Sequence, residues 1–202
     1  MRNPDRTTRG ALAPLSFYEK ALPGDVKTII SQMKGRKFDR SIIRGISRRC
    51  IWGYPQVFVC SPLKDLKPFP TVFWLSCPYL VKKCAIEESS GGIPLMEGFM
   101  KSSSNEWKKY NIRASIIRLQ LLSPVQRKFL RCYYPAIFKV IQRTMIGGIS
   151  SQEIPTMKCL HLQVAAWLSL KGHPGNDWLR SRFPSTDCES ACSQICGCQD
   201  HN

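Results

Sequence analysis

The sequence predicts an α+β fold, a small antiparallel sheet of about three or four strands packed with several helices and followed by a cysteine-rich tail. Short β-branched and aromatic runs lie close together between residues 41 and 77, which is typical of antiparallel strands. Apolar residues at helical spacing dominate from residue 79 onward. A chain of 202 residues that is 43% hydrophobic can bury one core.

The first half of the chain contains one predicted helix and three predicted strands. Pro23 opens a helix whose apolar residues continue to Lys34, and Gly35 ends it. The predicted strands cover residues 41–47, 56–60 and 71–77. We assign residues 1–22 to a flexible basic arm, 23–183 to a single α+β domain, and 184–202 to the tail.

The second half is predicted to be helical. Pro78 favours a helix over residues 79–88 with Cys77 near its N-cap, because proline suits the first helical position. Residues 94–122 form a helical pattern with a serine-rich break at 102–104. Ser123 is a plausible N-cap for the next helix, which Pro135 bends or ends. A last apolar helix is predicted over residues 157–170.

The positive charge is concentrated in two segments. The formal net charge is +16, from 30 basic and 14 acidic residues. Residues 1–49 carry 12 basic and 4 acidic residues, and residues 101–150 carry 10 and 1. The segments 1–49 and 101–145 therefore predict a surface that binds a polyanion, such as nucleic acid, or an acidic protein. A generically basic solvated surface is the alternative.

The compartment is predicted to be the cytoplasm. The first 17 residues lack the apolar run of a signal peptide, and no apolar stretch approaches 18 residues, so no membrane partner is expected. Cytoplasmic thiols stay reduced. The ten cysteines are therefore expected to be ligands, nucleophiles or small core residues, and Cys60, Cys84 and Cys132 fall where core residues are expected.

Three cysteines lie where a thiolate is favoured. Cys50 follows Arg48 and Arg49, Cys77 precedes a predicted helix, and Cys159 lies in the first turn of another beside a lysine. Helix N-termini and neighbouring cations both lower the pKa of a thiol, and metals bind the thiolate.

His161 follows Cys159 by two residues. On a helix their side chains diverge by about 200°, so they would share a metal only if the turn were extended or distorted. His161 is therefore a candidate ligand, a candidate general base beside Cys159, or a structural histidine. His173 is a second candidate base, while His201 lies at the end of the chain.

The tail adds a cluster of cysteines at residues 188, 192, 196 and 198. Spacings of four place Cys188, Cys192 and Cys196 on one side of a helix, where they could bind one metal. We predict a zinc or iron–sulfur centre, because both prefer thiolates. Its predicted ligands are Cys50, Cys77, Cys159, Cys188, Cys192 and Cys196.

Motifs of other chemistries are missing from the sequence. It contains no G-x-G-x-x-G or Walker A loop, and no H-E-x-x-H or G-x-S-x-G motif. Dinucleotide-dependent and serine-hydrolase chemistry therefore lack support. The enzymatic alternative is a nucleophilic Cys77 or Cys159 with His161 as base.

Several blocks of the chain carry a family resemblance. The runs at residues 49–57, 68–80 and 88–93 are R-C-I-W-G-Y-P-Q-V, P-F-P-T-V-F-W-L-S-C-P-Y-L and E-S-S-G-G-I, and the later blocks are G-G-I at 147–149, K-C-L-H at 158–161 and H-P-G at 173–175. Together they resemble the bacterial family numbered 501 among the domains of unknown function.

The resemblance implies a small cytosolic bacterial protein of uncharacterised activity. It places the family's motif cysteines at Cys50, Cys77 and Cys159, and its histidine at His161. Further histidines often follow this block in the family, whereas Gln163 and Ala166 stand nearby here, which disfavours a polyhistidine site. The combined expectation is a protein that binds a metal through cysteine thiolates.

Overall fold

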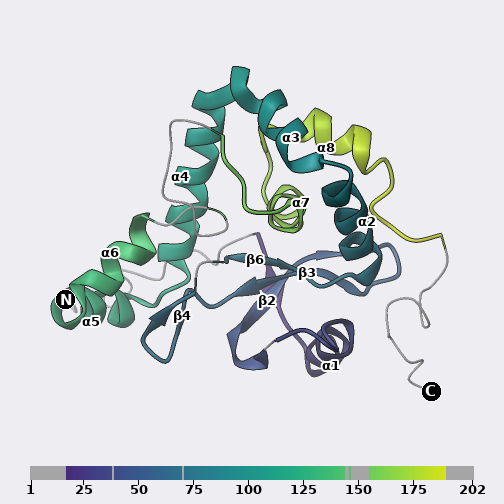
Figure 1. Ribbon diagram of the computed structural model, residues 1–202. Coiled ribbons are helices and arrows are strands. Elements are labelled where there is room, and N and C mark those ends of the chain that lie inside the picture. The colour runs from purple at the N-terminus through teal and green to yellow at the C-terminus, as the bar shows by residue number, and fades with distance from the viewer. Residues whose placement is uncertain (1–16, 38, 70, 144–145, 147–154, 190–202) are drawn as a thin grey trace, which may run out of the picture.

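The computed structural model describes residues 17–37, 39–69, 71–143, 146 and 155–189. Its central element is a four-stranded antiparallel sheet with the strand order β1-β2-β3-β6 (Figure 1). The strands are β1 (Glu19–Lys20), β2 (Ile43–Arg49), β3 (Pro55–Cys60) and β6 (Phe73–Leu75). The predicted α+β class and antiparallel sheet are confirmed.

The two faces of the sheet pack against different helices. Val57 and Val59 of β3 join the larger core with α2 (Pro78–Ser89) and α7 (Leu160–Ser169). Phe58, between them, joins a second core with α1 (Pro23–Gln32). Successive strand residues point to opposite faces, and both faces are covered, so all six residues of β3 are buried.

The remaining helices surround this centre. Two short strands, β4 (Leu63–Lys64) and β5 (Lys67–Pro68), form a separate ribbon. The 3₁₀ turns are η1 (Arg40–Ile42) and η2 (Lys101–Ser103). The other α-helices are α3 (Gly92–Met100), α4 (Ser104–Gln120), α5 (Pro124–Tyr133), α6 (Pro135–Arg143) and α8 (Asn176–Arg182).

Several predicted helix boundaries are confirmed by their caps. Cys77 is the N-cap of α2, with Pro78 as its first residue. Ser123 caps α5: its hydroxyl accepts the Gln126 N–H, and the Gln126 side chain accepts the Ser123 N–H. The serine-rich break corresponds to η2. The sequence analysis did not predict α8.

Residues 17–22, assigned above to a flexible arm, instead join the fold. β1 pairs with β2, and the ring of Phe17 lies 5.9 Å from that of Phe73. Gly45 makes this possible, because a Cβ there would lie 2.3 Å from the Glu19 carbonyl oxygen. The rest of the predicted arm, residues 1–16, lies outside the described residues.

The start of the predicted tail also packs on the domain. The Gln56 side chain donates to the Thr186 carbonyl, and the Ile51 N–H donates to Asp187. The indole N–H of Trp52 donates to the carbonyl of Cys188, whose side chain is buried in the larger core. The domain therefore extends to residue 188.

Within the part of the chain described above, no helix is both long enough and apolar enough to cross a membrane.

Candidate functional site

The junction of α2 and α7 brings three metal-ligating side chains together. Glu88 comes from the last turn of α2, and Cys159 and His161 come from the start of α7. One ligand atom from each of the three lies within 4.8 Å of those of the other two. Among the described residues, no other group of three or more such side chains meets this criterion.

The backbone at Cys159 explains why two residues so close in sequence can point to one place. The expected helix over residues 157–170 begins later, at Leu160, and Cys159 is its N-cap with φ −165° and ψ 157°. This extended conformation replaces the helical geometry that would separate Cys159 from His161 by about 200°. Of the two cases considered for this pair, a helical turn and an extended one, the structure therefore shows the extended one.

Glu88 holds the start of α7 through one carboxylate oxygen. Its Oε1 accepts the Leu160 N–H at 2.6 Å and lies 3.0 Å from His161 Nδ1. An ionised carboxylate can only accept, so Nδ1 carries the proton in this arrangement. The lone pair of the ring is then at Nε2, as in histidines that a carboxylate orients toward a metal or a reacting proton.

A second carboxylate fixes the chain just before the site. Glu97 of α3 accepts the Met157 N–H at 2.8 Å. Gly92 allows α3 to pass close to α7, because a Cβ there would lie 3.0 Å from the Leu160 side chain and 2.7 Å from the Glu87 carbonyl. The site is thus built on two helices and a tethered loop.

The expectation that Cys159 favours its thiolate is wrong, because burial raises the pKa of this thiol more than Lys158 and two backbone hydrogen bonds lower it. Burial raises the pKa of Cys159, and the Glu88 carboxylate raises it further, against the opposing hydrogen bonds from the Leu162 and His161 amides. Burial also raises the pKa of Cys84, with contributions from Glu88 and Cys159. Cys84 lies one turn before Glu88 on α2, and it therefore borders the site.

The other predicted ligands lie elsewhere or outside the described residues. Cys77 is buried at the start of α2, Cys50 is half-buried where β2 ends, and Cys188 is buried near Trp52. None of them belongs to the Glu88 group. Cys192 and Cys196 lie outside the described residues, so the predicted multi-cysteine centre stays a prediction.

The three expected core cysteines divide into two kinds. Cys60 and Cys84 are fully buried, as expected. Cys132 is exposed, so the core assignment is wrong for it. Cys132 lies on α5, in which Leu130 is the buried residue.

His173, the second candidate base, is a structural residue. Its Nε2 lies 3.1 Å from the Gln163 side-chain oxygen, and its Nδ1 accepts the Gly175 N–H at 3.0 Å. Burial lowers its pKa to about 3, so the ring is neutral at pH 7. Both nitrogens are occupied, which leaves no site for proton transfer.

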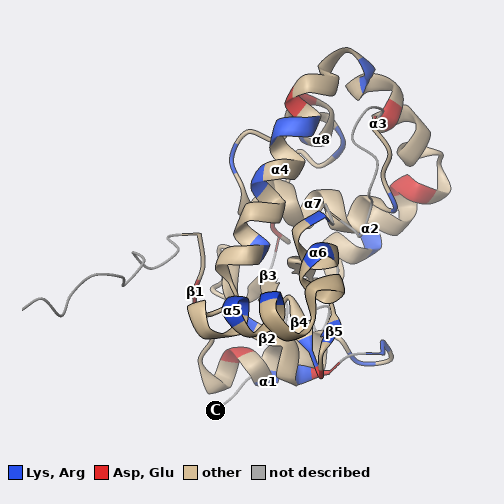
Figure 2. Cartoon of the chain, turned by 90° about the vertical axis from the view of Figure 1, so that its left-hand side faces the viewer, with Lys and Arg blue, Asp and Glu red and all other residues tan. Residues whose placement is uncertain are grey.

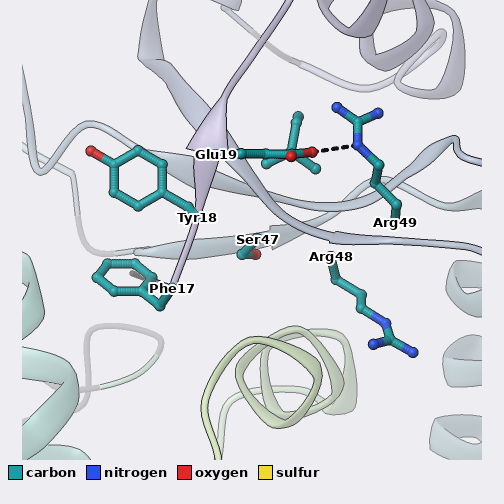
Figure 3. A pocket seen from close by; sticks show the side chains of 7 residues that line it. Phe17, Tyr18, Glu19, Ser47, Arg48 and Arg49 are labelled. Carbon is teal, nitrogen blue, oxygen red and sulfur yellow. Dashed lines mark hydrogen bonds and ion pairs between the residues drawn. The ribbon is translucent and has the colours of Figure 1, made fainter. Parts of the chain in front are cut away.

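A hollow in the described surface shares no residue with the Glu88 group. This cavity of about 290 Å³ is lined by residues 17–19, at the start of β1, and by residues 46–49 of β2. Figure 3 shows Arg49 paired with Glu19 on one side of β2 and Arg48 directed to the other side. The Ser47 hydroxyl lies 2.8 Å from that of Ser169. No histidine or cysteine lines this cavity, so it lacks the chemistry of the junction.

The sequence analysis missed Glu88 as a site residue. It lies within a block that carries the family resemblance, but 71 positions separate it from Cys159. No spacing rule connects two residues on different helices, and only the packing of α2 on α7 places them together.

Comparison with known proteins assigns a family without an activity. No curated protein and no solved structure matches the chain. Residues 46–180, more than half of the chain, match the family described as "Protein of unknown function (DUF501)", and this span includes Glu88, Cys159 and His161. The chain is therefore a member of the DUF501 family.

Proposed function

We propose that this protein binds a zinc ion at the α2–α7 junction through Cys159, His161 and Glu88. The observation that carries the proposal is the convergence of one sulfur, one imidazole nitrogen and one carboxylate oxygen within 4.8 Å. Zinc binds these three donor types, and three protein ligands leave a fourth position for water or a substrate.

The carboxylate beside the buried thiol of Cys159 favours the binding of a cation at this site. A buried thiol beside a carboxylate resists ionisation, whereas a divalent ion between them stabilises both negative groups. Thiolate and imidazole donors favour zinc over magnesium or calcium. The group contains one thiol, which favours zinc over the iron–sulfur cluster that the sequence leaves open.

Metal and acid-labile sulfide content of the anaerobically purified protein tests the proposal. We expect about one zinc per chain and no sulfide. Cys159→Ser and His161→Ala should lose the zinc, while Cys132→Ser, which changes an exposed thiol on α5, should keep it. Protein that holds no zinc after incubation with the ion, or zinc that survives both site substitutions, would overturn it.

The contact between Glu88 and His161 also favours a second candidate, a cysteine-dependent enzyme. Glu88 would orient the imidazole, whose Nε2 would take the proton of Cys159. This mechanism requires one thiol that alkylates rapidly near pH 7 in metal-free protein and slows in His161→Ala. Slow alkylation of Cys159 would exclude it, and slow alkylation is what burial of that thiol favours.

We also infer an anionic partner for the basic helices α4 to α6. Figure 2 shows Lys and Arg on all three, with Asp and Glu mostly on other elements. In the first basic segment, by contrast, Arg49 is already paired with Asp25 and Glu19. Retention on heparin that falls steeply with salt would support this inference, and salt-independent behaviour would contradict it.

A further inference from the structure

The outer side of α5 exposes a stripe of apolar side chains. Val125, Phe129 and Tyr133 follow one another at four-residue intervals, so they lie on one side of the helix. Val125 is 77% exposed and Tyr133 is 72% exposed. The Phe129 ring lies 5.2 Å from that of Tyr133 and 5.5 Å from that of Tyr134. We call these four residues the α5 ridge.

Exposed cations lie on α5, the helix that carries the α5 ridge, and on its neighbour α6. They are Lys128 on α5 and Lys139 and Arg143 on α6. Arg131 lies about 160° around α5 from the ridge, and its guanidinium lies 5.8 Å from the Phe138 ring of α6. No Asp or Glu occurs between residues 107 and 143, and among the described residues none of the three exposed cations forms an ion pair. These two helices therefore combine an apolar stripe with exposed positive charge.

The helix that carries the ridge is preformed. The Ser123 capping box starts α5, and Leu130 on its inner side packs with Leu122 and Ile141 in a small separate core. Figure 1 shows α5 at the edge of the molecule, with α6 beside it. Because α5 is already folded and held, binding through the ridge needs no ordering of the helix.

We propose that the anionic partner inferred for the basic helices, on which this proposal rests, is the surface of a lipid bilayer with anionic headgroups. The α5 ridge inserts its apolar side chains among the acyl chains near the headgroups, and the exposed lysines of α5 and α6 contact the lipid phosphates. A helix that lies in the interface needs no membrane-spanning length.

The character of the ridge favours lipid over nucleic acid and over an acidic protein. A helix that reads the major groove presents Arg, Asn or Gln to the bases, whereas α5 presents Val, Phe and Tyr. Val125 has no ring on which a base could stack, and the Phe129 ring packs against its neighbours. A protruding apolar helix also suits a soft bilayer, which accommodates it without a matching groove.

Sedimentation with vesicles tests the proposal. We expect binding to vesicles of phosphatidylcholine with one-third phosphatidylglycerol, and weak binding to pure phosphatidylcholine. Lys128→Glu with Lys139→Glu should weaken binding at least about tenfold, because each cation near an anionic surface contributes about fivefold. Val125→Ser with Tyr133→Ser should weaken it to a similar extent.

Lys82→Glu with Ile86→Ser is the matched control, because it changes an exposed lysine and an exposed isoleucine on α2. It should leave vesicle binding unchanged. Thermal unfolding of each variant verifies that it is folded.

The outcomes separate this proposal from the anionic partner itself. Heparin retention without vesicle binding would overturn the lipid proposal and leave the anionic partner standing. Vesicle binding that the Val125 and Tyr133 substitutions do not change would also overturn it. Tight binding of a single-stranded oligonucleotide, lost in the Lys128 and Lys139 variant and without vesicle binding, would assign the surface to nucleic acid. If the unmodified protein binds neither heparin nor vesicles, both proposals are overturned.

Discussion

Two histidines on opposite ends of α7 have opposite surroundings. His161 lies in the first turn, half-buried, with Nδ1 held by Glu88. His173 lies beyond the last turn and is buried against the ring of Tyr110, whose centroid is 4.8 Å away. Both nitrogens of His173 are engaged within the fold, whereas Nε2 of His161 has no hydrogen bond recorded among the described residues.

The comparison shows what distinguishes a structural histidine from a candidate functional one: whether both ring nitrogens are hydrogen-bonded within the fold. A buried imidazole with both nitrogens satisfied contributes to folding and cannot accept a ligand. A partly exposed imidazole held at one nitrogen keeps the other available. The four predictions below test this contrast, in order of expected effect on the free energy of unfolding.

Replacing each of the two histidines by alanine should give the largest difference in the free energy of unfolding. His173→Ala removes a buried ring with two hydrogen bonds and should lower the free energy of unfolding by about 3 kcal/mol. It should leave zinc bound to the folded protein. His161→Ala should abolish zinc binding and change the metal-free stability by less than about 1 kcal/mol. Urea unfolding and zinc content measure both; the same stability loss in both variants would contradict the contrast.

Zinc itself should stabilise the protein. An ion that binds only the folded chain adds about 2.7 kcal/mol when its free concentration is 100 times the dissociation constant. Thermal unfolding with and without zinc should show this shift. It should disappear in Cys159→Ser and persist in Cys132→Ser, and an equal shift in both would indicate binding elsewhere.

Stability should fall in mild acid because of His173. Its pKa is about 3 in the folded chain and near 6.5 when unfolded. Above pH 6.5 both forms are neutral. As the pH falls toward 3 the unfolded form binds the extra proton, so stability decreases by up to about 1.4 kcal/mol per pH unit. Urea unfolding of metal-free protein between pH 6.5 and 4.5 measures this slope, and His173→Gln should flatten it. An unchanged slope would assign it to other groups.

Replacing Glu88 should have a smaller effect on stability than the loss of His173, the binding of zinc or the change of pH, and it should also lower zinc affinity. Glu88→Gln weakens the contacts to the Leu160 amide and His161, which costs about 1 kcal/mol. Zinc affinity should fall sharply, because Glu88 is one of the three proposed ligands and the neutral amide of glutamine is a weaker zinc ligand than a carboxylate. The control is Glu97→Gln, which alters the neighbouring contact to Met157. Equal loss of zinc affinity in both variants would show that loop position alone matters.

Local patterns predicted much of the fold and two of the three residues of the candidate site. The helix at Pro78, the cap at Ser123 and the strands around residues 57 and 73 follow from proline, serine and β-branched residues whose preferences act within a few positions. Cys159 was identified from the predicted helix start beside a lysine, and His161 because it follows Cys159 by two residues. The short strand β1 escaped prediction because two residues hold no periodicity.

The sequence by itself determined the α+β class, the family, the basic character of residues 101–143 and the candidate pair at residues 159 and 161. Only the tertiary structure decided that Glu88 joins this pair and that Cys50 and Cys77 do not belong to the group. It also decided that both ring nitrogens of His173 are hydrogen-bonded within the fold. Residue preferences act over a few positions, whereas ligand convergence and burial depend on how distant helices pack. Cys159 depends on both: the sequence identified the residue, and its extended backbone in the folded chain brings it together with His161.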